Sequence, residues 1–301
     1  MAKKTSPAPV AKKSGFVALI GRSNVGKSTL LNTLVGTKIA ATSFRPQMTR
    51  NIIHGAFNTP EGQAVFVDTP GILKIRKSRL TARLLHKVEE ILQDIDLIIY
   101  VVDPSRDIGQ EERGIFGMIR HLDIPKILVI NKSDLPREER AFQSAYEDLG
   151  KDFDAVLSLS ALRASHIEPL KQKVMEFLPV GEPFYLDEQL TNIDNYFWIA
   201  EIIREKVFSI FEKEVPYSMS VEVDNVEQKM VTKEGKKEEI TVIAARILTN
   251  QERYKKVIIG SQGSKIKEIG VMARRELEAA INTKVFLELE VEVDPHWVER
   301  V

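Results

Sequence analysis

Short apolar runs recur over the first 180 residues of the chain, and amphipathic segments separate them. The runs are rich in Val, Ile and Leu without polar alternation, which is typical of parallel strands buried on both faces. We expect strands at 16–20, 64–67, 96–102, 126–130 and 155–159, and helices at 27–35, 80–92, 111–121, 137–149 and 167–177. A weaker strand at 51–58 ends in Thr59-Pro60-Glu61-Gly62, which predicts a hairpin and one antiparallel edge. The pattern predicts an α/β domain: a mostly parallel sheet with helices on both faces.

The pattern changes after residue 178. Residues 179–190 contain two prolines and one glycine and show no period, so we expect a linker there. Beyond it we expect a helix, two strands around a charged hairpin loop at 233–239, two helices and a last strand at 284–293. The order α-β-β-α-α-β predicts a second, α+β domain. The domains that we expect are a disordered basic tail at 1–14, a first domain at 15–178, the linker at 179–190 and a second domain at 191–301.

The amino-acid composition excludes only a few kinds of site and leaves the class of partner open. The chain has 43 Lys plus Arg and 43 Asp plus Glu, so its net charge of zero neither requires nor forbids a nucleic-acid partner. The absence of cysteine excludes disulfides, zinc–thiolate sites and thiol nucleophiles. No apolar run approaches the roughly 20 residues of a membrane span, and the lysine-containing amino terminus has no apolar stretch, so we expect no secretory signal. A basic arm that touches RNA is the alternative interpretation of this tail.

Residues 21–28, Gly-Arg-Ser-Asn-Val-Gly-Lys-Ser, follow a strand and open a helix. Gly21 and Gly26 let the backbone curl around phosphates, Lys27 can reach the β- and γ-phosphate oxygens, and the Ser28 hydroxyl can ligate Mg²⁺. The motif therefore predicts a phosphate-binding loop, for which a purely structural glycine turn is the alternative. The residues that we assign to it are Gly21, Arg22, Ser23, Asn24, Val25, Gly26, Lys27, Ser28 and Thr29.

Two further segments supply candidate groups around the phosphates. Asp68 ends a buried strand, where its carboxylate can hold magnesium, and Gly71 leaves its N–H free to meet the γ-phosphate. Thr49 lies in the loop after the first helix, and its hydroxyl is a candidate Mg²⁺ ligand when the γ-phosphate is present. A loop threonine without a ligand is the alternative. We predict that Lys27, Thr49 and Gly71 act in catalysis.

Asn131-Lys132-Ser133-Asp134 follows the strand at 126–130 and predicts a guanine site. The Asp134 carboxylate can accept from N1–H and the 2-amino group of guanine, a donor pair that adenine lacks. Asn131 can orient the base and Lys132 can cover its plane. Ser160-Ala161 ends the next strand and can offer a backbone N–H to the guanine O6. Together the motifs predict a GTPase.

The residue after Gly71 is Ile72, where Ras-like proteins carry a glutamine that positions the attacking water. An aliphatic side chain cannot orient water. We therefore expect slow intrinsic turnover that depends on a further factor.

A Gly-x-x-Gly step between the two middle helices of the second domain predicts a loop that the backbone of single-stranded nucleic acid can approach. Residues 246–275 carry eight Lys or Arg against two Glu, a local net charge of +6. A solvated, charged helix face is the alternative. The RNA-binding residues that we predict are Ile259, Gly260, Ser261, Gln262, Gly263, Lys265, Ile266 and Lys267.

The motifs at 21–28, 45–50, 68–71 and 131–134, with the segments 187–191, 200–206 and 259–270, resemble the Era family of bacterial ribosome-assembly GTPases. The resemblance covers everything except the first 14 residues. It implies a P-loop GTPase domain followed by a KH type II domain, with GTP or GDP and Mg²⁺ bound. It further implies binding to the 3′ end of 16S rRNA and to the small ribosomal subunit. Family members lack the catalytic glutamine, in agreement with Ile72.

Related potassium-dependent GTPases suggest Asn24 as a K⁺ ligand near the phosphates. One departure from the family is the uncharged pair Ser261-Gln262, which leaves phosphate contact to Lys265 and Lys267. We expect a cytoplasmic monomer and consider peripheral association with the inner face of the cell membrane. Two alternatives remain open: a GTPase whose second domain docks a protein or membrane partner, and an RNA-binding protein that uses nucleotide only structurally.

Overall fold

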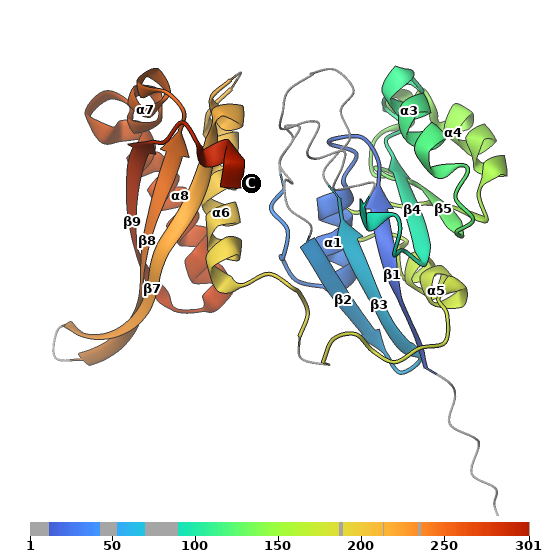
Figure 1. Ribbon diagram of the computed structural model, residues 1–301, viewed down its shortest axis with the longest axis horizontal. Helices are drawn as coiled ribbons and strands as arrows, with labels where there is room; N and C mark the ends of the chain where they lie inside the picture. The colour runs from blue at the N-terminus through green and yellow to red at the C-terminus, as the bar shows by residue number, and fades with distance from the viewer. Residues whose placement is uncertain are drawn as a thin grey trace, which may run out of the picture. The chain divides into compact units, whose positions relative to one another are not determined.

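The computed structural model describes residues 12–42, 53–69, 90–186, 189–212, 214–233 and 236–300 (Figure 1). Backbone contacts divide the chain into two compact units. Among the described residues, the first unit holds 12–38, 53–69, 90–186 and 189–192. The second unit holds 39–42 and the chain from Ile193 onwards.

The first unit contains a sheet of six strands. Their order across the sheet is β2 (Ile53–Thr59), β3 (Gly62–Asp68), β1 (Lys13–Ile20), β4 (Leu97–Val102), β5 (Lys126–Ile130) and β6 (Ala155–Ser158). Neighbouring strands are parallel except β2 and β3, which form an antiparallel hairpin at one edge. Every residue of β4 is buried, as expected for a strand covered on both faces. The predicted α/β class and its antiparallel edge are confirmed.

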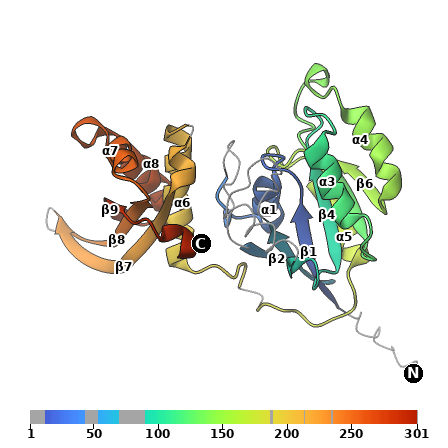
Figure 2. The same ribbon diagram turned by 45° about the horizontal axis from the view of Figure 1, so that its top comes forward.

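Helices cover both faces of this sheet. One core cluster joins alternate residues of β1 and β4 to Ile115 and Ile119 of α3 (Gln110–Ile119) and to Tyr146 of α4 (Gln143–Leu149). Figure 2 shows α3 in front of β4. The helices α1 (Lys27–Val35) and α5 (Ile167–Phe177) contact each other and β3. Because β1, β3, β4, β5 and β6 are parallel, their carboxyl ends lie at the same edge of the sheet. Ligands of such sheets bind at that edge.

Two of the predicted helices are not found in the structure as a single described helix. The prediction of a single helix over 137–149 was wrong, because a 3₁₀ turn at Arg137–Glu139 ends where Arg140 leaves helical geometry, at φ −99° and ψ 47°. No residue of 137–142 is buried, so no packing extends α4 toward its amino terminus. The helix predicted at 80–92 lies mainly outside the described residues.

The segment that follows α5 is hydrogen-bonded to the first unit. The buried amide of Gln63 accepts from the backbone N–H groups of Phe184 and Tyr185 at 2.8 and 3.0 Å and donates to the Tyr185 carbonyl at 2.9 Å. Farther along, the N–H of Ala56 in β2 donates to the Leu190 carbonyl at 2.8 Å. Parts of the segment predicted as a linker are therefore hydrogen-bonded to the β2–β3 hairpin.

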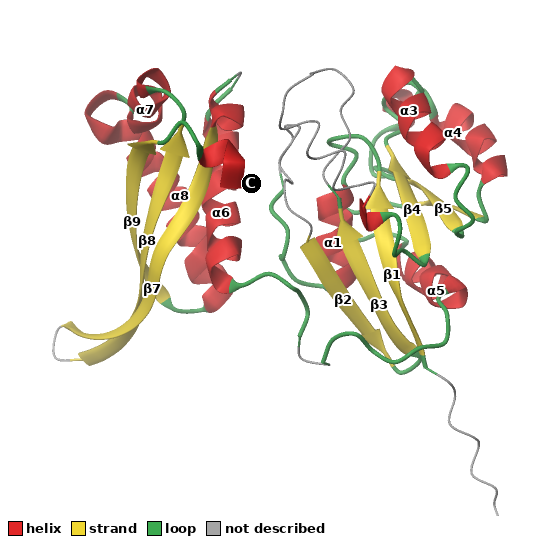
Figure 3. Ribbon diagram, viewed as in Figure 1, coloured by secondary structure: helices red, strands yellow, loops and turns green. Residues whose placement is uncertain are grey.

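The second unit combines three helices with a three-stranded sheet (Figure 3). Its elements are α6 (Asn195–Ile210), β7 (Met219–Lys233), β8 (Lys236–Thr249), α7 (Glu252–Ile259), α8 (Ser264–Ile281) and β9 (Lys284–Val293). The sheet order is β7-β8-β9, with β7 and β8 antiparallel and β8 and β9 parallel. A core that includes Ile203, Ile247 and Leu277 joins helices and sheet. The predicted order α-β-β-α-α-β is confirmed.

The charged hairpin loop predicted at 233–239 was wrong, because the β7–β8 ladder continues until Lys233 pairs with Lys236. The strand β9 reaches only as far as Ile240, so the hairpin extends beyond the sheet as a two-stranded ribbon. Charged side chains are tolerated on such a ribbon because water reaches both of its faces. The remaining 3₁₀ turns are Gly150–Asp152, Val215–Ser218, Ser261–Gly263 and Trp297–Arg300.

Within the described ranges, none of the helices is both long and apolar enough to cross a membrane. The same ranges contain no cluster of three or more His, Asp or Glu side chains suited to a metal ion.

Candidate functional site

The loop between β1 and α1 has a backbone that only glycine can form at two positions. Gly21 has φ +154°, and an added Cβ would lie 2.3 Å from the Val101 carbonyl oxygen. Gly26 has φ +102°, and its Cβ would lie 2.3 Å from the Asn131 amide nitrogen. Gly26 also caps α1 without a side-chain acceptor, so the first N–H groups of this helix remain oriented toward a ligand. The loop has the geometry of a phosphate cradle.

Lys27 lies inside this cradle. Its ammonium donates to the carbonyls of Gly21 and Arg22 at 3.1 and 3.0 Å. Burial lowers the pKa of Lys27 to about 8, while the carboxylates of Asp68 and Glu112 oppose the shift. Phosphate oxygens in the loop would restore the favourable environment of the charged form. The buried ammonium is thus available to an anionic ligand and costs little further desolvation.

Ser28 and Asp68 lie side by side at the mouth of the loop. The Ser28 hydroxyl donates to Asp68 Oδ2 at 2.6 Å, and Asp68 is fully buried at the end of β3. A hydroxyl beside a carboxylate is a pair of hard oxygen donors, which suits Mg²⁺. The other predicted groups around the phosphates, Thr49, Gly71 and Ile72, lie outside the described residues.

The predicted guanine residues converge on the same end of the sheet. Asn131 is buried; its amide donates to the Val25 carbonyl at 2.8 Å and accepts from the Ala161 N–H at 2.9 Å. Asp134 accepts a hydrogen bond from the Ser160 hydroxyl and stays exposed, with a carboxylate available to a base. One buried amide therefore connects three segments that sequence alone could only place on separate strands.

Lys132 adopts a left-handed backbone with φ +60° and pairs with Asp103 at the end of β4. Burial raises the pKa of Asp103, but hydrogen bonds from Lys132 and Ser105 outweigh this effect and hold it below its usual value. The ion pair restrains the Lys132 side chain beside the end of β4.

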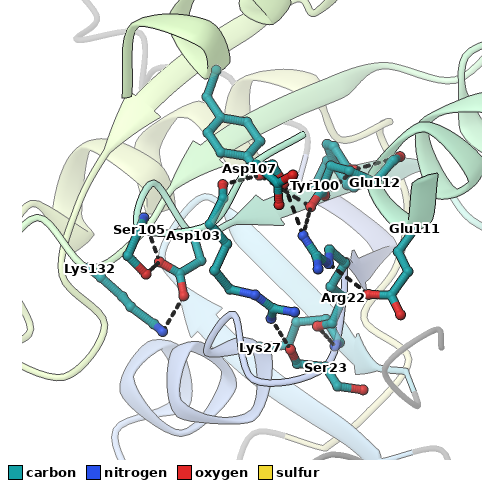
Figure 4. A network of polar contacts seen from close by, with 12 residues as sticks. Arg22, Ser23, Lys27, Tyr100, Asp103, Ser105, Asp107, Glu111, Glu112 and Lys132 are labelled. Atoms are coloured by element: carbon teal, nitrogen blue, oxygen red, sulfur yellow. Dashed lines mark hydrogen bonds and ion pairs between the residues drawn. The ribbon is translucent and has the colours of Figure 1, made fainter. Parts of the chain in front are cut away.

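The sequence did not point to a second layer of charged and phenolic groups behind the loop (Figure 4). Arg22 and the Ser23 carbonyl, which we assigned to phosphate binding, are tied to this layer. Its other members are Tyr100, Arg106, Asp107, Glu111, Glu112 and Tyr146. The sequence shows two adjacent acids, Glu111 and Glu112, at the start of a predicted helix, but only the structure shows that both are buried. Buried carboxylates require partners, and these partners lie at the nucleotide site.

In the second unit, the loop from Gly260 to Gly263 joins α7 to α8. Gly260 has φ +74°, and an added Cβ would lie 2.9 Å from the backbone nitrogen of Lys265. Gly263 caps α8 in the left-handed region. Ser261 and Gln262 are exposed, so an extended ligand can approach the backbone of the loop.

The side chains around this loop divide into basic and apolar groups. Lys265 and Lys267 are exposed, and Lys265 pairs with Glu268 at 2.8 Å. Ile259 and Ile266 are partly buried against the core and provide an apolar floor. Arg246, which contributed to the local charge of +6, lies instead on β8, where Asp224 and Glu292 neutralise it at 2.7 Å each. The basic surface is therefore confined to the two helices and the loop.

Two family models match the chain: one described as a 50S ribosome-binding GTPase over residues 16–132, and a KH domain over residues 214–298. Together with the sheet and the loop between β1 and α1, they define a P-loop GTPase joined to a KH domain. The GTPase Era of Caldanaerobacter subterraneus is 42% identical over 294 residues, covering 96% of this chain and 95% of that protein. Era of Halothermothrix orenii is 40% identical over 290 residues, with the same coverage of each chain. The chain belongs to the Era family of GTPases.

Solved structures agree along almost the whole chain. A crystal structure of Era in complex with MgGDPNP and nucleotides 1506–1542 of 16S ribosomal RNA has a TM-score of 0.86 and 33% identity and covers 96% of each chain. An Aquifex aeolicus Era variant bound to GDP and AlF₄⁻ has a TM-score of 0.85 and 33% identity, again with 96% coverage of both chains. Both units thus have counterparts in proteins of the family.

Proposed function

We propose that this GTPase binds the single-stranded 3′ end of 16S rRNA through the loop Gly260–Gly263 and assists assembly of the small ribosomal subunit. Nucleotide state then controls how firmly the RNA is held. One observation supports the proposal: a glycine loop around the buried Lys27 and an exposed glycine loop between lysines occur in a single chain. Its support is the likeness to the Era structure that holds MgGDPNP and 16S nucleotides.

At the phosphates, we assign binding to the backbone N–H groups of residues 21–29 and charge neutralisation to Lys27. Ser28 and Asp68 hold the magnesium ion together with Thr49, while the Gly71 N–H meets the γ-phosphate. Magnesium, when bound, neutralises the charge that develops on the β- and γ-phosphate oxygens during transfer. Lys27, Thr49 and Gly71 contribute by holding the transferred group in line with water.

At the base, Asp134 accepts from the two donors on the guanine edge. Asn131 fixes the loops that carry Val25 and Ala161, and the Ala161 N–H faces the guanine O6. Ser160 orients the Asp134 carboxylate through the hydrogen bond between them. The Lys132 stem covers the base plane.

Hydrolysis in this protein needs help that Ile72 cannot supply. We assign part of it to a K⁺ ion held by Asn24, whose left-handed backbone at φ +66° places it at the turn of the phosphate loop. The test is GTP turnover in K⁺ and in Na⁺ buffer, for wild type and Asn24→Ala. We expect faster turnover in K⁺ and loss of that difference in the variant. Equal rates in both buffers would refute the K⁺ assignment.

The RNA assignment is tested with an oligonucleotide from the 3′ end of 16S rRNA and the variant Lys265→Glu, Lys267→Glu. Both lysines are exposed, so the substitutions leave the core intact and reverse the charge beside the loop. The matched control is Arg274→Glu, Arg275→Glu, which makes the same charge change on exposed residues farther along α8.

We expect the lysine variant to lose binding in fluorescence anisotropy while the arginine variant retains most of it. Unchanged affinity in the lysine variant would favour the alternative, in which the KH domain docks a protein. Crosslinking of the GTP-loaded protein to ribosomal RNA would then map any remaining contact.

The proposed function implies a place in the cytoplasm, where ribosomal subunits assemble. A monomeric state and peripheral association with the inner face of the membrane remain predictions. Light scattering during gel filtration measures the first, and flotation with anionic lipid vesicles measures the second.

A further inference from the structure

A single buried carboxylate organises the layer behind the phosphate loop (Figure 4). Glu112 is 1% exposed and lies in the first turn of α3. It accepts hydrogen bonds from the hydroxyl of Tyr100, from the hydroxyl of Tyr146 at 3.2 Å and from Arg22 Nη1 at 3.3 Å. A carboxylate withdrawn from water to this extent is stable only with several donors, and here they come from β4, α4 and the loop.

The Tyr146 hydroxyl extends the network to a second arginine. It lies 3.1 Å from the Arg106 carbonyl as well as near Glu112, so its single proton is shared between the two acceptors. Arg106 in turn donates from Nη1 to the Ser23 carbonyl at 2.8 Å. The loop is thus tied on its outer side at two consecutive residues, through the Arg22 side chain and through the Ser23 carbonyl.

The residue that follows these two ties is Asn24, whose left-handed backbone at φ +66° belongs to a region that few residues other than glycine adopt, asparagine among them. The contacts of the neighbouring residues hold the turn on both sides. Lys27 holds the loop from inside through the carbonyls of Gly21 and Arg22. From outside, Arg22 is anchored further by Glu111 at 3.0 Å and by the Asp107 carbonyl at 3.1 Å.

We propose that Arg106 and Glu112 are positioning residues of the nucleotide site. Arg106 fixes the Ser23–Asn24 turn directly, and Glu112 fixes it through Arg22 and through Tyr146. The loop is then held in its ligand-bound shape before GTP arrives, which reduces the ordering that binding requires. The same ties connect the phosphates to α3 and α4, on the face of the sheet opposite α1. The inference deepens the proposed nucleotide site and does not involve RNA.

The test compares two arginines of the same region. Arg106→Ala removes the bond to the Ser23 carbonyl, and Arg113→Ala is the matched control, since Arg113 is exposed on α3. The measurement is dissociation of a fluorescent GDP analogue, together with kcat and KM for GTP in K⁺ and in Na⁺. For Arg106→Ala we expect dissociation faster by roughly tenfold, the equivalent of one charge-assisted hydrogen bond.

Two further outcomes separate positioning from simple stability. Arg106→Lys, which keeps one donor, should restore part of the slow dissociation, and the K⁺ to Na⁺ ratio of turnover should fall in Arg106→Ala because the Asn24 turn relaxes. Equal dissociation rates for Arg106→Ala and Arg113→Ala overturn the proposal for Arg106.

Glu112 is tested through a milder change, because Glu112→Gln leaves Arg22 with a weaker partner in a buried site and can prevent folding. Tyr146→Phe removes only the hydroxyl that joins Glu112 to Arg106. We expect it to speed GDP dissociation by about threefold, a fraction of the loss of a full hydrogen bond. A rate equal to wild type overturns the connection from Glu112 to the loop through Tyr146. Wild-type protein that does not bind GDP would instead refute the proposed nucleotide site.

Discussion

The phosphate loop of the first unit and the glycine loop of the second use the same backbone device. Each opens a helix at a left-handed glycine, Gly26 before α1 and Gly263 before α8. Each also contains one left-handed residue that is not glycine, Asn24 in the first loop and Gln262 in the second. In both, the cap residue is a glycine without a side chain, so its helix N–H groups can meet an anion.

The two loops differ in how they are surrounded. Lys27 is 6% exposed and donates to the carbonyls of its own loop, whereas the side chain of Lys265 is 46% exposed and pairs with Glu268. A small ligand can be enclosed, so its site can bury charges and tie them into a network. A polymer must enter and leave along its length, so its site has to stay at the surface. The same turn thus serves two ligands because burial differs.

Replacing Lys27 and Lys265 in separate variants should give the strongest contrast between the two loops. Lys27→Ala should weaken GDP binding by roughly 30- to 150-fold, which corresponds to about 2–3 kcal/mol for bonds from a buried charge. Lys265→Ala should weaken binding of the rRNA oligonucleotide by less than about fivefold, because an exposed charge contributes about 0.2–1 kcal/mol. Calorimetry and anisotropy measure the two affinities. Similar losses in both variants would contradict the contrast in burial.

Replacing the glycine that precedes each helix tests how closely the backbone of each loop is packed. Gly26→Ala and Gly263→Ala both place a side chain in the left-handed region, which costs about 1–2 kcal/mol. Only at Gly26 does the new Cβ meet a close neighbour, the Asn131 amide at 2.3 Å; at Gly263 the nearest atom is 3.9 Å away. We expect Gly26→Ala to lose more than tenfold in GDP affinity beyond the common backbone cost. Equal stability losses with intact GDP binding would show that the loop relaxes around the added methyl group.

Salt concentration should change the affinity for RNA more than the affinity for GDP in the wild-type protein. If two or three phosphates of a single strand are neutralised, RNA affinity falls by roughly tenfold between 50 and 200 mM salt. The buried Lys27 is shielded from ions, so GDP affinity at saturating Mg²⁺ should change by less than about threefold. A flat salt response of the RNA complex would mean that its contacts are not electrostatic.

A smaller effect is expected from pH. Burial lowers the pKa of Lys27 to about 8 in the free protein, although the carboxylates of Asp68 and Glu112 oppose this shift, and bound phosphate raises the pKa. Binding therefore takes up a proton, and GDP affinity should fall by at most tenfold per unit as pH rises above about 8. Calorimetry of GDP binding at pH 8 in buffers of different ionisation enthalpy measures this uptake. Lys27→Arg is the control, because a guanidinium stays charged throughout this range.

Much of the fold and the candidate site was accessible from sequence. Continuous apolar runs such as 97–102 indicated strands buried on both faces, and the glycine spacing of 21–28 indicated a tight turn before a helix. The helix predicted at 137–149 failed, because an amphipathic pattern does not reveal whether a neighbour is present to cover it. The charged hairpin loop failed for a related reason, since strand pairing there depends on the partner strand and not on composition.

The amino-acid sequence was enough to predict the class of this protein from the alternation of strands and helices, the phosphate-loop motif, the Asn131–Asp134 motif and the glycine step before α8. Each depends on residues close together in the chain, where local geometry and hydrogen-bonding chemistry decide. The contacts of Glu112, Tyr146 and Arg106 behind the phosphate loop became visible in the tertiary structure alone. The same holds for the hydrogen bonds between Gln63 and the segment after α5. Those contacts join residues 34 to 121 positions apart, and no local pattern encodes which buried polar groups will meet.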